Sequence, residues 1–216
     1  MRANNRYGRV GVKEFSDASV RVGHPVVIEE RFLDGDTVFK TQLERIITTS
    51  PDAILIWGNA KESALILLQL REMGMKQQVY GSDRMVSPEF LKIANKLADG
   101  VVTTCQYNPN ADNPKLKEFQ ANYLKRFGKE PDVFAAHAYD GMNLIIEAIR
   151  KAGLNRVLIR DVLLDLKTFQ GYQGVTGKMV FDQTWNDIGD IWMAQVRQGK
   201  FEFSPTLPLD MKKDKK

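Results

Sequence analysis

The sequence predicts an α/β protein in which helices flank a parallel sheet. Short apolar segments that suit buried strands alternate with longer segments whose apolar residues recur at helical spacing. Two of the short segments, at residues 51–59 and 77–83, end in glycine followed by polar residues. Repeated alternation of strand and helix is typical of parallel sheets, and ligands bind such sheets at the carboxyl ends of the strands. We therefore expect a ligand-binding edge at the ends of these two segments.

The strands expected in the first part of the chain are short and mainly apolar. They lie at residues 26–32, 53–57, 79–81 and 101–105. The run at 53–57 is almost entirely apolar, as in a parallel strand that is covered on both faces. Cys105 is the only cysteine, so an internal disulfide is excluded and the residue is expected to pack in the core.

Helices are expected between these strands, at residues 7–22, 39–47, 60–73 and 115–127. A further helix should begin after Ser87, whose hydroxyl can cap it, with Pro88 at its first position. Asp36 or Thr37 is expected to cap the helix that follows them. No strand is expected before the helix at 7–22, although such a helix normally follows a central strand, so the sequence reads as though it begins in the middle of a fold.

The alternation of strand and helix stops after residue 132. Two helices, at 135–152 and 156–166, follow without a strand between them. Glycine-punctuated strands, with a hairpin turn before the last, are expected at 176–181, 192–196 and 201–203. We therefore divide the chain into residues 1–132, 133–190, 191–204 and a basic tail at 205–216.

Composition bounds the classes of protein to which the chain can belong. With 216 residues, of which 43% are hydrophobic, it can bury one large core or two small ones. Much of the net charge of +4 lies in residues 211–216, which we interpret as a solvated terminus, so no nucleic-acid or membrane partner is expected. No apolar run approaches the ~20 residues that cross a bilayer, and the N-terminus lacks an apolar signal core, so the chain expressed as given would be cytoplasmic.

Six short strings, taken with their order and spacing, resemble periplasmic amino-acid-binding proteins of the leucine, isoleucine and valine type. These proteins are the type I substrate-binding components of ABC importers. The strings are RYG at 6–8, DGDT at 34–37, PDAI at 51–54, YGSD at 80–83, AYDG at 138–141 and GVTGKMVFD at 174–182. The resemblance extends from Tyr7 to Phe203 and covers only about the second half of a family member.

Family members have two α/β lobes joined by three crossing segments, and they trap a ligand in the cleft as the lobes close. By this resemblance, residues 1–132 form most of the second lobe, 133–190 return to the first lobe, and 191–204 form the last crossing. The signal peptide, the body of the first lobe and the first central strand of the second lobe are expected to be missing. The gap in the sheet would be filled by another copy of the chain, closed by rearrangement, or left open with poor folding.

Asp83 aligns with the carboxylate that, in the family, holds the α-ammonium group of the ligand. A carboxylate at the end of a strand, in a partly desolvated cleft, forms a strong charge-assisted hydrogen bond with such a group. The family usually has glutamate at this position, and the neighbouring Arg84 could neutralise Asp83 in place of a ligand. The alternative is that Asp83 only caps a turn.

Four further residues are candidates for contact with the ligand. Tyr7 aligns with an aromatic residue of the family's second lobe, and packing is an equal alternative. Asn59 could hydrogen-bond a ligand or cap the helix that begins at Ala60. Ser82 belongs to the polar end of its strand, and Tyr107 follows a strand and could reach the rim of the cleft. In the family the ligand carboxylate is held by the first lobe, so this chain is expected to supply only half of the groups that bind the ligand.

The resemblance implies noncovalent binding of an amino acid or a related amide, as all or part of the substrate-binding component of an ABC importer in the periplasm. The implied partners are the small-molecule ligand and a membrane permease. A ligand-sensing domain of the same fold and a fragment without binding activity are the alternatives.

An enzyme is the less favoured interpretation. No glycine-rich dinucleotide loop or phosphate loop follows a strand, and the glycine-rich stretch at 171–177 matches no phosphate motif. The only histidines, His24 and His137, lack the partners of a metal site or a catalytic triad. We therefore expect neither a cofactor nor a metal.

Overall fold

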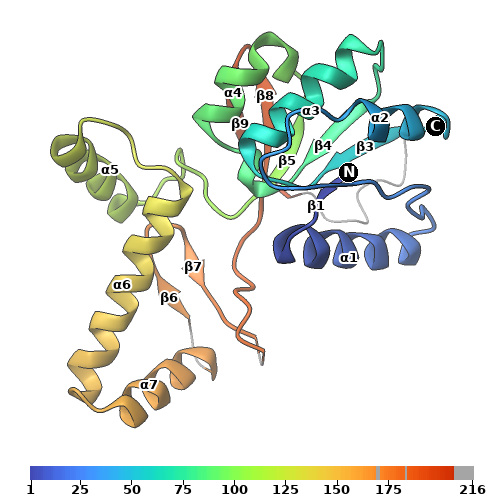
Figure 1. Ribbon diagram of the computed structural model, residues 1–216. Coiled ribbons are helices and arrows are strands. Elements are labelled where there is room, and N and C mark those ends of the chain that lie inside the picture. The colour runs from blue at the N-terminus through green and yellow to red at the C-terminus, as the bar shows by residue number, and fades with distance from the viewer. Residues whose placement is uncertain (169–170, 183, 207–216) are drawn as a thin grey trace, which may run out of the picture. The chain divides into compact units, whose positions relative to one another are not determined.

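The computed structural model describes residues 1–168, 171–182 and 184–206, which form two compact units (Figure 1). Unit 1 consists of Met1–Cys105 together with the segment that begins at Met193, and unit 2 consists of the residues between them. The predicted basic tail at 205–216 lies almost wholly outside the described residues. Among the described residues, none of the helices combines the length and the hydrophobicity of a membrane-spanning segment.

Unit 1 is built on a five-stranded sheet in the order β3-β4-β5-β8-β9. Its strands are β3 (Ala53–Ile56), β4 (Gln78–Gly81), β5 (Val102–Cys105), β8 (Trp192–Arg197) and β9 (Lys200–Pro205). The first three strands are parallel, with Ile54 opposite Val79 and Tyr80 opposite Val102. The parallel sheet that the alternation of strand and helix predicted is therefore confirmed.

A short strand precedes the first helix, and the prediction that this strand is missing was wrong. Strand β1 (Arg2–Ala3) is parallel to β2 (Arg31–Phe32), and Arg2 also forms a parallel bridge to Trp57, which follows β3. The Ala3 amide donates to the Trp57 carbonyl at 2.8 Å, and the Trp57 amide donates to the Met1 carbonyl at 2.9 Å. Strand β1 thus lies between β2 and β3. These pairings remove the reason for expecting another copy of the chain at this place.

The helices of unit 1 follow its strands in the expected order. They are α1 (Arg6–Arg21), α2 (Lys40–Ile47), α3 (Ala60–Glu72) and α4 (Pro88–Ala94), with short 3-10 turns at η1 (Asp83–Met85) and η2 (Asn95–Ala98). Ser87 caps α4 as predicted, because its hydroxyl accepts a hydrogen bond from the Phe90 amide at 3.2 Å. The predicted cap of α2 was wrong: the Asp36 carboxylate instead accepts from the Leu33 amide at 2.7 Å and closes the preceding turn.

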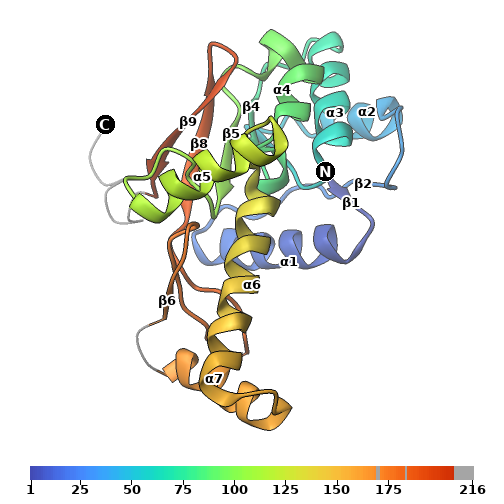
Figure 2. The same cartoon turned by 90° about the vertical axis from the view of Figure 1, so that its left-hand side faces the viewer.

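The two faces of the sheet in unit 1 are covered by different helices. Ile56 of β3 is fully buried in the core that includes Leu67 of α3 and Phe90 of α4. Successive residues of a strand point to opposite faces, so Trp57 points toward the other side. There α1 approaches so closely that a Cβ added at Gly11 would lie 2.1 Å from the Trp57 ring. Helix α1 therefore covers the face opposite α3 and α4 (Figure 1 and Figure 2).

Unit 2 consists of three helices and a small antiparallel sheet. They are α5 (Pro114–Phe127), α6 (Val133–Ala152), α7 (Arg156–Thr168), β6 (Tyr172–Gln173) and β7 (Lys178–Met179). Helix α5 packs against α6, with the Phe119 and Tyr139 rings 4.6 Å apart between centroids. The unit therefore begins at Gln106, whereas the predicted division after residue 132 placed α5 with the sheet of unit 1. The predicted boundary differs from the observed one because the alternation of strand and helix in the sequence continues through α5. This alternation does not indicate which unit α5 packs against.

A buried carboxylate holds the glycine-rich turn of unit 2. Asp140 is fully buried and accepts hydrogen bonds from the Val175 amide and from the Thr176 amide and hydroxyl, at 2.8, 2.8 and 2.7 Å. A Cβ added at Gly174 would lie 2.2 Å from this carboxylate, so only glycine allows the close approach. The glycines of this stretch thus serve the geometry of the turn, since Gly171 and Gly177 also have positive φ.

Candidate functional site

Polar and aromatic side chains gather at the carboxyl ends of the parallel strands in unit 1. Tyr7 lies in the first turn of α1, which follows β1. Asn59 lies between β3 and α3, and Ser82 and Asp83 directly follow β4. Because β1, β3 and β4 run in the same direction, these residues share one edge of the sheet, where α/β proteins bind ligands.

Tyr7 and Asp83, both predicted as ligand contacts, are joined by a hydrogen bond. The Tyr7 hydroxyl donates to the Asp83 carboxylate, although the two residues are far apart in sequence. Burial and the negative charge of Asp83 raise the pKa of Tyr7, so the hydroxyl keeps its proton at neutral pH. The Tyr7 ring also contacts Trp57, with 5.9 Å between ring centroids. The Asp83 carboxylate is thus oriented by a tyrosine that is itself held by the packing of α1.

Arg84 lies over the Tyr7 ring rather than in an ion pair with Asp83. The guanidinium carbon is 3.8 Å from the centroid of the Tyr7 ring, which is close enough for a cation–π interaction. Its Nη1 donates to the side-chain oxygen of Asn59 at 2.7 Å. Among the described residues, no ion pair joins Arg84 to Asp83, so the alternative that Arg84 neutralises Asp83 by direct pairing is not observed.

Asn59 is the residue before α3, but its side chain does not cap that helix. Its oxygen accepts from Arg84, and its nitrogen donates to Asp34 in a long hydrogen bond of 3.4 Å. The Asp34 carboxylate also accepts from Asn5 at 2.9 and 2.8 Å, and the oxygen of Asn5 caps α1 by accepting from the Gly8 amide. A series of side-chain hydrogen bonds therefore connects the start of α1 through Asn59 to Arg84.

The sequence analysis missed the contributions of Asn5 and Asp34 to this network. Asp34 belongs to the DGDT string, which we used only for the family resemblance and the expected helix cap, and Asn5 comes two residues before Tyr7. The sequence signals available for these two residues were the glycine after Asp34 and the start of a helix after Asn5. Neither signal shows that the two side chains meet, because the contact depends on the pairing of β1 with β2.

Ser82 is fully buried beneath the site. Its hydroxyl donates to the Gly58 carbonyl at 3.2 Å, and its amide donates to the Ile56 carbonyl at 3.1 Å. These two bonds connect the ends of β3 and β4. The structure therefore places Ser82 where it positions Asp83, and not at the surface that a ligand could reach.

Tyr107 lies in the core of unit 2, away from the predicted rim position. It is 5% exposed and packs in a cluster that includes Leu116, Phe119 and Val175. Burial raises the pKa of its hydroxyl. This environment favours a packing role for Tyr107, which follows β5 in sequence but leaves the sheet.

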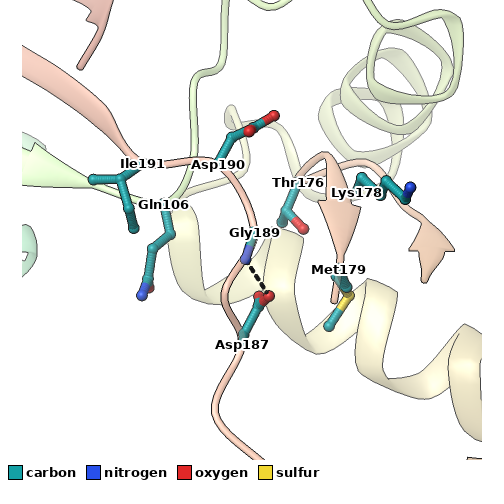
Figure 3. Close-up of a pocket in the computed structure, with 8 residues that line it drawn as sticks. All are labelled: Gln106, Thr176, Lys178, Met179, Asp187, Gly189, Asp190 and Ile191. Carbon is teal, nitrogen blue, oxygen red and sulfur yellow. Dashed lines mark hydrogen bonds between the residues drawn. The ribbon is translucent and has the colours of Figure 1, made fainter. Parts of the chain in front are cut away.

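A small pocket in unit 2 is another place where polar side chains gather (Figure 3). Gln106, Thr176, Lys178 and Asp187 are among the residues that line it. The Asp187 carboxylate accepts from the Gly189 amide at 2.9 Å and from the Val180 amide at 3.3 Å. These hydrogen bonds engage the Asp187 carboxylate within its own turn. We therefore favour the strand ends of unit 1 as the functional site.

The strand ends of unit 1 bring together a carboxylate, a guanidinium and an aromatic ring. In the part of the chain that the structure describes, no group of three or more histidine, cysteine, aspartate or glutamate side chains could hold a metal ion. The pairing of an oriented carboxylate with aromatic surface is typical of sites that fix a ligand by a few polar contacts and an apolar wall.

Comparison with known proteins identifies similar sequences and structures. Residues 1–200 match the family model described as periplasmic binding protein. Two curated relatives are Leu/Ile/Val-binding protein homolog 2 from Brucella abortus (strain 2308), 28% identical over 163 residues, and homolog 1 from Brucella suis biovar 1 (strain 1330), 26% identical over 164 residues. These alignments cover 71% and 72% of this chain and 42% of each relative, so the chain spans less than half the length of these curated relatives.

Two solved structures resemble the fold closely. A leucine-binding protein, LivK, from Thermotoga maritima is 28% identical with a TM-score of 0.85, covering 96% of this chain and 59% of that protein. The branched-chain amino acid substrate-binding protein LivJ from Streptococcus pneumoniae, solved with isoleucine, is 28% identical with a TM-score of 0.79. That match covers 94% of this chain and 57% of LivJ.

Proposed function

Because this chain belongs to the periplasmic binding protein family, we propose that it binds an amino acid or a related amide noncovalently. Such binding would make it all or part of the substrate-binding component of an ABC importer, acting in the periplasm with a membrane permease. The names of the similar proteins support an amino-acid ligand, since the Brucella relatives are named for leucine, isoleucine and valine and LivJ was solved with isoleucine. These names describe binding proteins, which also supports binding without catalysis.

The observation that carries this proposal is that the half-buried Asp83 carboxylate retains hydrogen-bond acceptors. It is half-buried at the carboxyl end of β4, and among the described residues its one hydrogen-bond donor is Tyr7. A carboxylate has about four lone-pair sites, so most of its acceptor capacity is free for a ligand. A ligand ammonium group at this position would form a charge-assisted hydrogen bond worth about 1.5–3 kcal/mol.

The neighbouring side chains suit the rest of a small amino acid. Tyr7 keeps the carboxylate in one orientation through its hydroxyl, which lowers the entropy lost when the ligand binds. Tyr7 and Trp57 contact each other and are half-buried, and an aliphatic side chain can pack on the part of these residues that stays exposed. Asn59 shapes the same edge through its hydrogen bond with Arg84.

Isothermal titration calorimetry of the full chain tests this proposal. The panel consists of L-leucine, L-isoleucine, L-valine and the amide L-leucinamide. We expect heat from at least one of these ligands, and we expect Asp83→Asn to weaken its affinity roughly 10- to 100-fold because the ammonium group loses its charged partner. Asp52→Asn removes an equal charge at an exposed position of unit 1 and should leave affinity unchanged.

Circular dichroism of each sample establishes that it is folded. A folded chain that releases no heat with any ligand of the panel would contradict the proposal. Equal affinities in the wild type and in Asp83→Asn would show instead that the carboxylate at the end of β4 is not the binding group.

A further inference from the structure

We propose that Arg84 binds the carboxylate of the amino-acid ligand, so that unit 1 alone holds both charged groups of the ligand. This inference rests on the proposed function, in which Asp83 binds the ammonium group. The resemblance led us to expect that the carboxylate is held elsewhere, by the first lobe of a family member. Arg84 makes unit 1 selective for zwitterions over simple amines and simple carboxylic acids.

The first argument is that Arg84 is held in place without a carboxylate partner. Its Nη1 donates to Asn59 at 2.7 Å, and its guanidinium lies 3.8 Å from the centroid of the Tyr7 ring. A guanidinium has five N–H donors, and the bond to Asn59 uses one of them. Among the described residues, no aspartate or glutamate forms an ion pair with Arg84. A half-buried arginine in this state retains donors that match a carboxylate in geometry.

The second argument is the position of both charges around one aromatic ring. The Tyr7 hydroxyl binds Asp83, while the face of the same ring carries Arg84. Asp83 and Arg84 are consecutive residues of η1, yet they bind Tyr7 and Asn59 instead of each other. An α-amino acid likewise carries its ammonium and carboxylate groups on one carbon atom. The pair of separate, adjacent charges is therefore complementary to a zwitterion.

The third argument concerns the other acidic group near Arg84. Asp34 is exposed and lies on the far side of Asn59, whose nitrogen is 3.4 Å from it. Its two oxygens accept from Asn5 at 2.9 and 2.8 Å. Asp34 therefore orients Asn59 rather than neutralising Arg84, and the charge of the guanidinium remains available to a ligand.

Calorimetry with three matched probes tests the role of Arg84 in the full chain. The probes are L-leucine, 3-methylbutylamine, which lacks the carboxylate, and 4-methylpentanoate, which lacks the ammonium group. We expect the wild type to bind leucine at least about tenfold more tightly than the amine. In Arg84→Gln the affinity for leucine should fall to the level of the affinity for 3-methylbutylamine. The affinity for 3-methylbutylamine itself should stay the same or rise. Arg21→Gln, at an exposed position of α1, should change neither affinity.

The outcomes separate this inference from the proposed function. If Arg84→Gln weakens leucine and the amine by the same factor, or weakens neither, Arg84 does not bind the carboxylate and the inference is wrong, although Asp83 could still bind the ammonium group. If the folded wild type releases no heat with leucine, or if Asp83→Asn binds it equally well, the proposed function itself fails and the inference fails with it.

A second measurement on the wild type avoids dependence on the folding of Arg84→Gln. The Nε–H signal of Arg84 can be followed by nuclear magnetic resonance after its assignment with Arg84→Lys. We expect this signal to shift on addition of leucine and to stay in place on addition of 3-methylbutylamine. A shift of equal size with both probes would overturn the inference, because the amine offers no carboxylate to the guanidinium.

Discussion

Asp83 in unit 1 and Asp140 in unit 2 are residues of the same type whose carboxylates are used in opposite ways. Asp140 is fully buried and accepts three hydrogen bonds from Val175 and Thr176. Asp83 is half-buried and, among the described residues, accepts a hydrogen bond from Tyr7 alone. A buried charge must be satisfied by the protein, whereas a binding group must retain acceptors for its ligand. The contrast distinguishes a carboxylate that holds the fold from one that is available to a ligand.

One tyrosine from each unit, Tyr7 and Tyr107, shows the same difference. Tyr107 is 5% exposed within the core of unit 2, where it packs beside Leu116 and Phe119. Tyr7 is half-buried and directs its hydroxyl to Asp83. In the structure both residues are tyrosines that follow a strand, so burial and hydrogen bonding decide which of them belongs to a binding site.

Asp140→Ala should cause the largest loss of stability. The substitution leaves the buried amide of Val175 and the half-buried amide and hydroxyl of Thr176 without their acceptor, and we expect the free energy of unfolding to fall by about 3 kcal/mol or more. Urea unfolding followed by circular dichroism measures this loss. Asp83→Ala is the matched variant in unit 1 and should cost less than about 1 kcal/mol. An equal loss in the two variants would break the contrast between the two carboxylates.

Tyr7→Phe should weaken ligand binding while leaving stability nearly unchanged. The variant keeps the ring beneath Arg84 but removes the hydroxyl that orients Asp83, so we expect affinity for leucine to fall by about 1 kcal/mol, or roughly fivefold. Calorimetry measures the affinity. Tyr107→Phe is the matched variant in unit 2 and should not change it. Unchanged affinity in Tyr7→Phe would mean that the orientation of Asp83 does not depend on this hydroxyl.

Ser82→Ala should lower stability without changing ligand selectivity. The variant removes the buried hydrogen bond to the Gly58 carbonyl, and we expect a loss of about 1 kcal/mol in the free energy of unfolding. The ratio of leucine to 3-methylbutylamine affinities should remain that of the wild type, because Ser82 is buried beneath the site. A changed ratio with unchanged stability would place Ser82 among the ligand contacts instead.

Asp182→Asn should have the smallest effect, confined to the pH dependence of stability in unit 2. Hydrogen bonds from Asn186 and Thr184 lower the pKa of the Asp182 carboxyl to about 2. A carboxyl whose pKa is lower in the folded state stabilises the protein above its unfolded pKa of about 4 and loses this contribution as the pH falls toward 2. The wild type should therefore be more stable than the variant at pH 7, and the difference should shrink in acid. A difference in thermal stability that stays constant down to pH 2 would contradict this.

The sheet and most helices were predictable because their signals are local. The apolar run of β3 and the serine–proline start of α4 each identify an element without knowledge of its neighbours. Strand β1 was not predictable, since Arg2 and Ala3 form it only by pairing with β2 and Trp57. The division between units was misplaced for the same reason, because the packing of α5 on α6 is a tertiary contact.

The candidate site was predictable in part. Parallel strands end at one edge, so Tyr7, Asn59 and Asp83 could be expected to lie near one another, and hydrogen bonds in the structure join Tyr7 to Asp83 and Asn59 to Arg84. The sequence could not predict that Asn59 would bind Arg84 rather than cap α3, because both are good hydrogen-bonding geometries for asparagine. The burial of Ser82 was likewise hidden, since it depends on the contact between the ends of β3 and β4.

The most direct test of the central claim, that Asp83 is left available to a ligand, is a crystal structure of the full chain grown with L-leucine. We predict that the leucine ammonium group lies within hydrogen-bonding distance of the Asp83 carboxylate, at the carboxyl end of β4 and beside Tyr7. Leucine bound at another place, with Asp83 bonded only to protein groups, would contradict the claim.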